Sequence, residues 1–174
     1  MSGFHLPIQA ADRLLVERQG KEFSLRGMTE GDRDQHLAHL IRLSPENRYS
    51  RFQRAMSDAA LANYSEGIDW HSTLAFGVFE GDTLRGMAEL FPFEDGKGGE
   101  VAVSIEEDYQ HYGLGRLLVL ALQLIARRMG MRTLRLIYQN ENDGMKSLLD
   151  AMGASAQHSP DGAMGVLSIP PAQP

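Results

Sequence analysis

The 174-residue chain contains no cysteine. This excludes a disulfide framework, a thiolate zinc site and a cysteine nucleophile. No apolar run reaches the ~18 residues that a membrane-spanning helix needs, and the first residues lack the basic region and long apolar core of a secretory signal. We therefore expect a cytoplasmic protein with no membrane partner, and a chain of this length fits one domain.

Positive charge is also scarce, since the chain has 17 Lys and Arg but 23 Asp and Glu, which gives a net charge of −6. A nucleic-acid binder needs a basic stripe to displace counterions, so no nucleic-acid partner is expected. The negative charge instead favours cationic substrates such as amines. The six histidines are scattered and there is no Gly-x-Ser-x-Gly motif, which argues against a catalytic metal and a serine hydrolase.

The most informative stretch runs from Glu100 to Gly115 and reads EVAVSIEEDYQHYGLG. Small apolar residues alternate over 101–105, which predicts a strand, and a glycine-containing loop then opens onto an apolar helix. Backbone N–H groups in the first turn of a helix lack intrahelical partners and attract anions. Because glycines at 113 and 115 leave the backbone open to close approach, the stretch predicts a site for a phosphate-bearing ligand. Neither the dinucleotide fingerprint nor the P-loop is present.

The pattern Gln110-x-x-Gly113-x-Gly115 after a strand resembles the pyrophosphate loop of the GNAT superfamily, the acetyl-CoA-dependent N-acyltransferases. Other segments are similar to that family and follow in the same order. They are Phe23–Asp32, Leu43–Phe52, Glu100–Ile105 and Asn140–Gly153. The first two look closest to the GNAT domain of bacterial Pat-type protein lysine acetyltransferases.

The resemblance implies an α/β (α+β) fold, a three-layer sandwich in which helices flank a mixed, mostly antiparallel sheet. The order of expected elements agrees, because a meander of strands is followed by strand-helix-strand-helix-strand. We expect residues 1–20 to form an N-terminal tail or edge element, with a strand around residues 14–16. Residues 21–170 would form the acetyltransferase domain and residues 171–174 a C-terminal tail.

Two helices carry expectations about which side is buried. In the helix after Thr29, the residues Leu37, Leu40 and Ile41 share one face, which we expect to pack on the core. His36 then flanks this face and His39 points to solvent, a reading we favour over a metal-binding histidine pair. The helix over 115–129 is apolar on most sides, which predicts that it packs deep against the sheet.

The resemblance also implies acetyl-CoA as the cofactor. In the family, the glycine loop holds the pyrophosphate, the preceding strand pairs with the pantetheine arm, and an asparagine in the later helical segment touches that arm. Carried over residue by residue, this assigns cofactor binding to Val103, Ser104, Ile105, Gln110, His111, Tyr112, Gly113, Leu114, Gly115, Arg116 and Asn142.

Glu100 leads the central strand, where the family often places its general base. A lysine-like amine has a pKa near ~10.4, so deprotonating it at pH 7 costs roughly 4–5 kcal/mol. An ordinary carboxylate is a weak base for this step, so either burial raises the pKa of Glu100 or a water molecule relays the proton. The alternatives are that Glu100 is a solvent-facing residue at the strand end, or that Glu89 acts instead. Many members carry a tyrosine as general acid where this chain has Leu149, which leaves the acid unassigned.

The resemblance places the segment around Leu43–Phe52 beside the acceptor site. Candidate acceptor-lining residues are Arg48, Tyr49, Arg51, Phe52 and, on the neighbouring strand, Glu89. The alternative is a packed helix-turn-helix whose arginines are surface charges. The acceptor would be a primary amine, on a protein lysine or a small molecule, and the chain would act as a monomer or homodimer. Two rival functions are a non-catalytic acyl-CoA sensor or scaffold, and a nucleotide-binding module unrelated to CoA.

Overall fold

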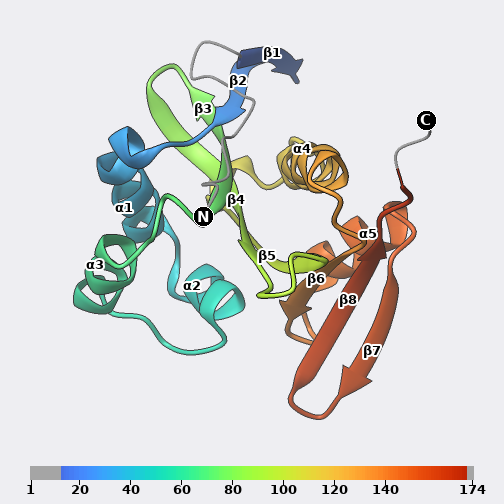
Figure 1. Ribbon diagram of the computed structural model, residues 1–174. Helices are drawn as coiled ribbons and strands as arrows, with labels where there is room; N and C mark the ends of the chain where they lie inside the picture. The colour runs from blue at the N-terminus through green and yellow to red at the C-terminus, as the bar shows by residue number, and fades with distance from the viewer. Residues whose placement is uncertain (1–12, 172–174) are drawn as a thin grey trace.

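The computed structural model describes residues 13–171 (Figure 1). One sheet of eight strands has the order β1-β2-β3-β4-β5-β6-β8-β7. Every neighbouring pair is antiparallel except β5 and β6, which are parallel, so the expectation of a mixed, mostly antiparallel sheet is confirmed. The strands are β1 (Arg13–Arg18), β2 (Lys21–Gly27), β3 (Leu74–Glu80), β4 (Thr83–Pro92), β5 (Gly98–Ile105), β6 (Thr133–Tyr138), β7 (Ser155–Ser159) and β8 (Gly162–Ser168).

Three helices begin at side-chain caps. The caps are Ser44, Ser57 and Asn142, whose side-chain oxygens accept backbone N–H groups at 3.2, 3.1 and 3.0 Å. Such a cap contributes about 1 kcal/mol, because it satisfies an N–H group that has no partner inside the helix. The helices are α1 (Arg33–Arg42), α2 (Pro45–Phe52), α3 (Asp58–Glu66), α4 (Leu114–Arg128) and α5 (Asp143–Ala151), with single turns η1 (Glu30–Asp32) and η2 (Glu107–Tyr109).

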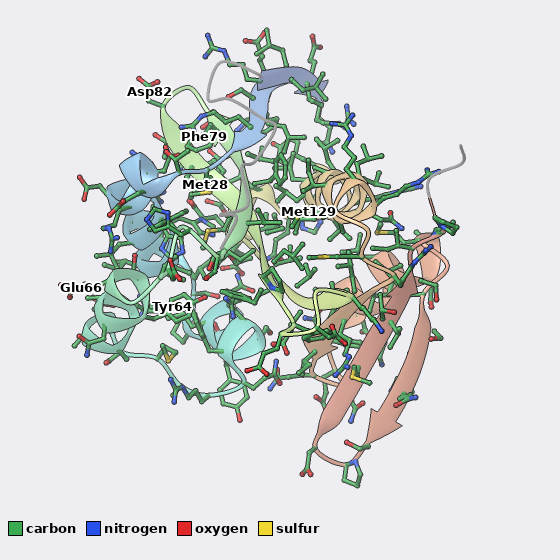
Figure 2. All side chains as sticks on the ribbon, viewed as in Figure 1. Met28, Tyr64, Glu66, Phe79, Asp82 and Met129 are labelled. Atoms are coloured by element: carbon green, nitrogen blue, oxygen red, sulfur yellow. The ribbon has the colours of Figure 1, made fainter. Side chains whose placement is uncertain are left out.

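Apolar side chains cover both faces of the sheet and form two cores. Figure 1 shows α1 and α3 on one side of β3 and β4, and α4 on the other. The α4 core contains Leu118 and Leu122 from the helix and Val101 from β5. The α1 core includes Met28 and Phe79, which Figure 2 labels. Each strand of the centre therefore presents one face to each core, as period-2 alternation requires.

The buried face of α1 differs from the expected one. Leu40 is buried, but Ile41 is 39% exposed, and His36 and His39 are both fully buried. The prediction that His39 points to solvent was wrong. The actual stripe is His36, His39, Leu40 and Leu43, which has the same helical spacing once histidine is counted as a core residue. Burial is tolerated because partners across the interface satisfy the ring nitrogens of both histidines.

The prediction for α4 was partly wrong as well. Leu118, Val119 and Leu122 are buried against the sheet, whereas Leu120 is 40% exposed and Leu124 is 62% exposed. The sheet covers only one side of the helix. Leucines on its outer side therefore remain in contact with solvent.

The N-terminal edge element expected near residues 14–16 is β1, which pairs with β2 from Arg13↔Arg26 to Arg18↔Lys21. The rest of the predicted N-terminal tail and most of the C-terminal tail, residues 1–12 and 172–174, lie outside the described residues. The domain boundaries at 20 and 170 stay predictions. In the described part of the chain, no helix combines the length and hydropathy that a membrane crossing requires.

β5 and β6 pair over only three residues each, from Gly98↔Thr133 to Glu100↔Arg135. The two strands lie very close together where they begin, since a Cβ on Gly98 would lie 2.5 Å from the Thr133 carbonyl oxygen. After Glu100 the two strands separate while each keeps its other neighbour. The sheet is therefore opened at its middle, and the functional cleft lies in this opening.

Candidate active site

A cleft of about 570 Å³ occupies the opening between β5 and β6. This is within the usual size range for a small-molecule or cofactor site. Its walls come from α2, β5, the loop before α4, β6 and α5. The lining residues are Asn47, Ser50, Arg51, Phe52, Gln53, Glu100, Val101, Ala102, Val103, Ser104, Ile105, Gln110, Gly113, Gly115, Arg116, Leu136, Ile137, Tyr138, Asn142, Gly144, Met145, Ser147, Leu148 and Ala151.

One wall is the free edge of β5. β4 pairs with this strand along its whole length, from Gly99 to Ile105, but β6 pairs with it only as far as Glu100. Backbone groups on the cleft side of residues 101–105 therefore have no strand partner. An extended ligand can bind such an edge as an added strand would, through main-chain hydrogen bonds.

The end of the cleft is the loop that leads into α4. Gly113 caps the helix in the left-handed region, with φ +71°, which glycine adopts without strain. Within the described residues, no backbone carbonyl accepts the N–H groups of residues 111–116. A run of free N–H groups at a helix N-terminus is a binding site for phosphate or another anion.

Contacts to three other elements hold this loop in place. The Tyr109 hydroxyl donates to Glu80 Oε1 at 2.7 Å. Gln110 Nε2 donates to Asn47 Oδ1 at 3.1 Å and to the Ile105 carbonyl at 3.2 Å, which joins the loop to α2 and β5. The N–H groups are thus already oriented before any ligand binds, and less ordering entropy is lost on binding.

Most of the predicted cofactor residues meet in the cleft. Those that line it are Val103, Ser104, Ile105, Gln110, Gly113, Gly115, Arg116 and Asn142. Three others do not: the His111 side chain is exposed, the Tyr112 ring packs against Phe23 at 5.5 Å, and Leu114 is buried in the core. Their side chains are directed away from the cleft, so only their backbone N–H groups remain available to a ligand.

Asn142 and Leu149 show how α5 meets the cleft. The Asn142 oxygen caps the helix by accepting Met145 N at 3.0 Å, which leaves its amide N–H groups for a ligand. Leu149 is 2% exposed, and a Cβ on Gly165 would lie 2.4 Å from one of its methyl carbons. The position where many family members carry a tyrosine acid is therefore packed into β8 and does not line the cleft.

Glu100 lines the cleft at the point where β5 and β6 part, and it is exposed. This exposure agrees with the alternative of a solvent-facing glutamate. If Glu100 is a base, the route through burial does not apply. Proton transfer to Glu100 through water remains.

Glu89 is placed differently from the expectation. It is 1% exposed and lies behind the cleft wall, not on it. His36 Nε2 lies 3.5 Å from Glu89 Oε2, Tyr64 OH donates to Oε2 at 3.1 Å, and Arg51 Nη2 donates to Oε1 at 3.3 Å. Burial acts to raise the pKa of Glu89, but hydrogen bonding from His36 and the Arg51 charge outweigh it and lower this pKa to about 2. Glu89 is a fixed anion that holds Arg51 and does not reach an acceptor.

Two of the four predicted acceptor-side residues of α2 line the cleft. Arg51 is 10% exposed at its side chain, and its Nη2 also donates to the hydroxyl of Tyr64 at 2.7 Å. Tyr64 lies on α3 (Figure 2). The Phe52 ring packs against Tyr64 with centroids 4.9 Å apart. Arg51 and Phe52 therefore form a wall that α3 and Glu89 hold in place.

Arg48 and Tyr49 do not line this cleft but face a separate hollow between α2 and residues 55–57. The Arg48 guanidinium donates to the carbonyls of Leu43, Ile41 and Met56 at 3.1, 2.7 and 3.0 Å. The alternative of a packed helix-turn-helix agrees with these contacts. Arg48 is not the surface charge which that alternative expected, since its side chain is only 14% exposed and joins the segments at both ends of α2. Successive helix residues are rotated by about 100°, so Arg48 and Tyr49 point away from the direction in which Asn47 faces the cleft.

The sequence prediction missed the β6 wall (136–138), the cleft-facing Asn47 and Ser50, and the apolar α5 residues such as Met145. No motif marks these positions. They become part of the site only because β6 diverges from β5. The spacing of Asn47, four residues before Arg51 and three before Ser50, was a usable signal, because residues three and four apart are neighbours on a helix surface.

A strand edge and a helix N-terminus that open on one cleft define the class of domain, an α/β fold with an interrupted sheet. The family described as "Acetyltransferase (GNAT) family" matches residues 36–154. "Acetyltransferase PA5475" of Pseudomonas aeruginosa is 32% identical over 154 residues, covering 85% of this chain and 83% of that protein. The chain belongs to the GNAT acetyltransferase family and is an acyltransferase, and this family generally uses acyl-CoA.

Two further comparisons concern Pat-type proteins. "Acetyltransferase Pat" of Mycolicibacterium smegmatis is 28% identical over 141 residues, which are 79% of this chain and 42% of that protein. The GNAT domain of S. lividans PAT superposes with a TM-score of 0.77 at 16% identity, covering 90% of this chain and 96% of that one. The structural likeness supports the fold, which confirms the three-layer GNAT architecture expected from the sequence.

Proposed function

We propose that the chain transfers an acetyl group from acetyl-CoA directly to a primary amine, with Glu100 as the general base. The observation that carries the proposal is the cleft itself. It has free N–H groups at residues 111–116 for the diphosphate, the β5 edge for the pantetheine arm, and Glu100 where the strands part. We expect the reaction to take place in the cytoplasm.

Each part of the cofactor has a matching surface in this arrangement. The cationic Arg116 stands in the first turn of α4 and lines the cleft beside the free N–H groups. The pantetheine amides would bond to β5 over Val103–Ile105, with Asn142 on the opposite wall. A thioester beyond them would lie near Glu100, where an amine can attack it without a covalent enzyme intermediate. CoA would supply the activated acyl group and a thiolate leaving group.

The acceptor enters on the α2 side in this proposal, past Arg51 and Phe52. A protein lysine ranks slightly ahead of a small amine, because the segment Leu43–Phe52 resembles Pat-type lysine acetyltransferases. The exposed position of Glu100 suits an acceptor that arrives as an ammonium ion, since its proton can pass to the carboxylate through water.

Replacing Glu100 with Gln tests the role of the base. We expect kcat to fall on the order of 10²-fold at pH 7, because one proton acceptor is lost, while the Kd for CoA stays within twofold. Thiol release with acetyl-CoA and a panel of amines, including a lysine peptide, measures kcat, and calorimetry measures the Kd. Glu107→Gln is the matched control, since Glu107 is an exposed glutamate beyond the other end of β5 that does not line the cleft.

The outcomes separate the rival functions. CoA binding by the wild type without thiol release to any amine would favour a sensor or scaffold. Stabilisation by ATP or NAD but not by CoA would favour an unrelated nucleotide-binding module. A ligand at ~100 times its Kd raises the unfolding free energy by about 2.7 kcal/mol, which a thermal shift detects.

A further inference from the structure

The hydroxyl of Ser104 lies on the cleft wall and ends a chain of buried hydrogen bonds. Ser104 is 6% exposed and lines the cleft. Its Oγ lies 2.9 Å from His39 Nε2, and His39 Nδ1 lies 3.0 Å from Glu106 Oε2. A hydroxyl, an imidazole and a carboxylate in this order are the arrangement that activates a hydroxyl in enzymes. Here it links β5, α1 and the turn after β5.

The surroundings of Glu106 decide where the protons lie. Burial acts to raise the pKa of Glu106, but the hydrogen bond from His39, the charge of Arg42 and the hydrogen bond from Arg85 outweigh it and lower that pKa. Arg42 Nε and Arg85 Nη1 both donate to Oε1, at 3.1 and 3.0 Å. An ionised carboxylate only accepts hydrogen bonds, so we assign the proton of the neutral His39 ring to Nδ1.

This assignment fixes the direction of the Ser104 hydroxyl. Burial lowers the pKa of His39, against the hydrogen bond and charge of Glu106, so the ring is neutral near pH 7. Nε2 then carries a lone pair, and Ser104 must donate to it. The oxygen of Ser104 keeps its own lone pairs for a group in the cleft. Ser104 is therefore a hydrogen-bond acceptor toward the ligand, backed by a base.

Ser104 also lies on the side of the sheet that faces the proposed acceptor. Residues directly opposite each other in paired strands share a face, and Met87↔Ser104 and Glu89↔Ala102 are such pairs. Met87 belongs to the α1 core, so Ala102 and Ser104 face α1 and α2. Glu100 shares this face because strand side chains alternate with period 2.

We propose that Ser104 is a second proton acceptor of the acyl transfer, with His39 as its base and Glu106 as the positioning carboxylate. This rests on the proposed function. An ammonium acceptor loses two protons on becoming an amide, and Glu100 takes the first through water. As the N–C bond forms and the C–S bond breaks, the second passes from nitrogen to Ser104 Oγ while the Ser104 proton passes to His39 Nε2. His39 then returns it by way of Ser104 to the CoA thiolate or to solvent.

The chain contains a matched set of residues that does not reach the cleft. Ser65 Oγ lies 2.7 Å from His36 Nδ1, and His36 Nε2 faces Glu89, as described above. Ser65 is 1% exposed and is not part of the cleft wall. Ser65→Ala removes a bond between a buried hydroxyl and a histidine of α1, as Ser104→Ala does. It is therefore the control for the effect of losing such a bond on stability.

The experiment compares Ser104→Ala with Ser65→Ala, using acetyl-CoA and the amine that the wild type acetylates fastest. We expect Ser104→Ala to lower kcat on the order of 10²-fold at pH 8. The Kd for CoA should stay within threefold, and Ser65→Ala should keep kcat within threefold. Ser104→Thr, which keeps the hydroxyl, should recover most of the activity. Chemical unfolding confirms that each variant is folded during the assay.

The pH dependence provides a readout that a structural role would not change. Below the pKa of His39, which lies under its ordinary 6.5, the imidazolium donates to Ser104 and the relay stops in the wild type too. The wild-type to Ser104→Ala ratio of kcat should therefore shrink toward one as pH falls through that pKa. The charged or titratable groups that face His39 are His36 and Arg42 from α1, Glu106, and Arg85 through Glu106.

Three results would overturn the relay while leaving the proposed function intact. They are a kcat of Ser104→Ala within threefold of the wild type, a kcat ratio independent of pH, and an acetyl group trapped on Ser104 in mass spectra. The last would make Ser104 a nucleophile. Failure of the proposed function looks different, because the wild type itself would then release no thiol to any amine.

Discussion

At the scale of single residues, buried polar side chains join α1 to the sheet, to the turn after β5 and to α3. His36 and His39 each use both ring nitrogens across this interface, toward Ser65 and Glu89 and toward Ser104 and Glu106. Removing one partner from a buried polar set leaves the others desolvated and unpaired, which is more costly than losing the bond itself. These residues therefore contribute to stability as well as to the chemistry proposed for them.

Glu89→Gln tests the energetic importance of this set. We expect a loss of about 3 kcal/mol in the unfolding free energy, because Arg51 would keep a largely buried charge without its counterion. Urea unfolding at pH 7 measures the change. The control is Glu30→Gln, which removes an ion pair with Arg33 at 3.2 Å whose carboxylate is 68% exposed, and it should cost under about 1 kcal/mol. Equal effects of the two substitutions would contradict the prediction.

At the scale of elements, the loop from η2 into α4 and the free edge of β5 make the cleft. Either element alone is common in proteins. Here Gln110 bonds to Asn47 and to the Ile105 carbonyl, so the free N–H groups of the loop and the strand edge hold a defined separation. A long cofactor with phosphates at one end and amides along its arm fits such a pair of surfaces.

Gly115→Ala tests whether the first turn of α4 holds the phosphates. A Cβ at this position would lie 3.8 Å from Leu148 and 3.9 Å from Val103, which are ordinary contacts, so the fold can accept it. The methyl group would narrow the approach of a phosphate, and we expect CoA to bind at least tenfold more weakly, or about 1.4 kcal/mol. Titration calorimetry measures the affinity.

The unfolding free energy of Gly115→Ala should stay the same or rise by up to about 1 kcal/mol, because alanine favours the helix. The control is Gly31→Ala, whose Cβ would lie 3.6 Å from Thr29 Oγ1, away from the cleft. Undiminished CoA affinity in Gly115→Ala would show that the phosphates bind elsewhere.

At the scale of the whole molecule, the sheet is held between two cores that have different character. The α4 core consists of aliphatic and aromatic side chains, including Tyr109 and Tyr138, whereas the α1 side includes His36, His39 and Glu89. Stability should therefore depend on pH chiefly through the α1 side.

The direction of that dependence follows from the pKa shifts. The pKa of His39 is lower in the folded chain than its ordinary 6.5, so below pH 6.5 the unfolded chain binds the proton first and stability falls. The pKa of Glu89 is lowered from 4.5 to about 2. Its contribution to the unfolding free energy is therefore present above pH 4.5 and is lost as pH falls from there toward 2. Urea unfolding from pH 8 to 3 should show a decline below 6.5 that steepens below 4.5. His39→Gln should remove the first part only, and a flat profile between pH 8 and 5 would exclude this account.

The sequence by itself determined the order of elements and the family, and it predicted an anion site in the loop before α4. Strand alternation, the start of a helix after Thr29 and the Gly113–Gly115 pattern are local, so each can be recognised in one stretch of chain. The resemblance of the segment Leu43–Phe52 also indicated Arg51 and Phe52 as residues that line the cleft. All of these signals lie within a few consecutive residues.

Only the tertiary structure decided which of these residues meet. Glu89 and Glu100 share a face of the sheet, but side chains of α1, α2 and α3 cover Glu89, whereas Glu100 lies where β5 and β6 part. His39 is a core residue because Ser104 and Glu106, more than sixty positions away, satisfy its ring nitrogens. Burial of a polar group depends on partners from distant segments, and a sequence pattern that scores each residue by its own polarity does not contain that information.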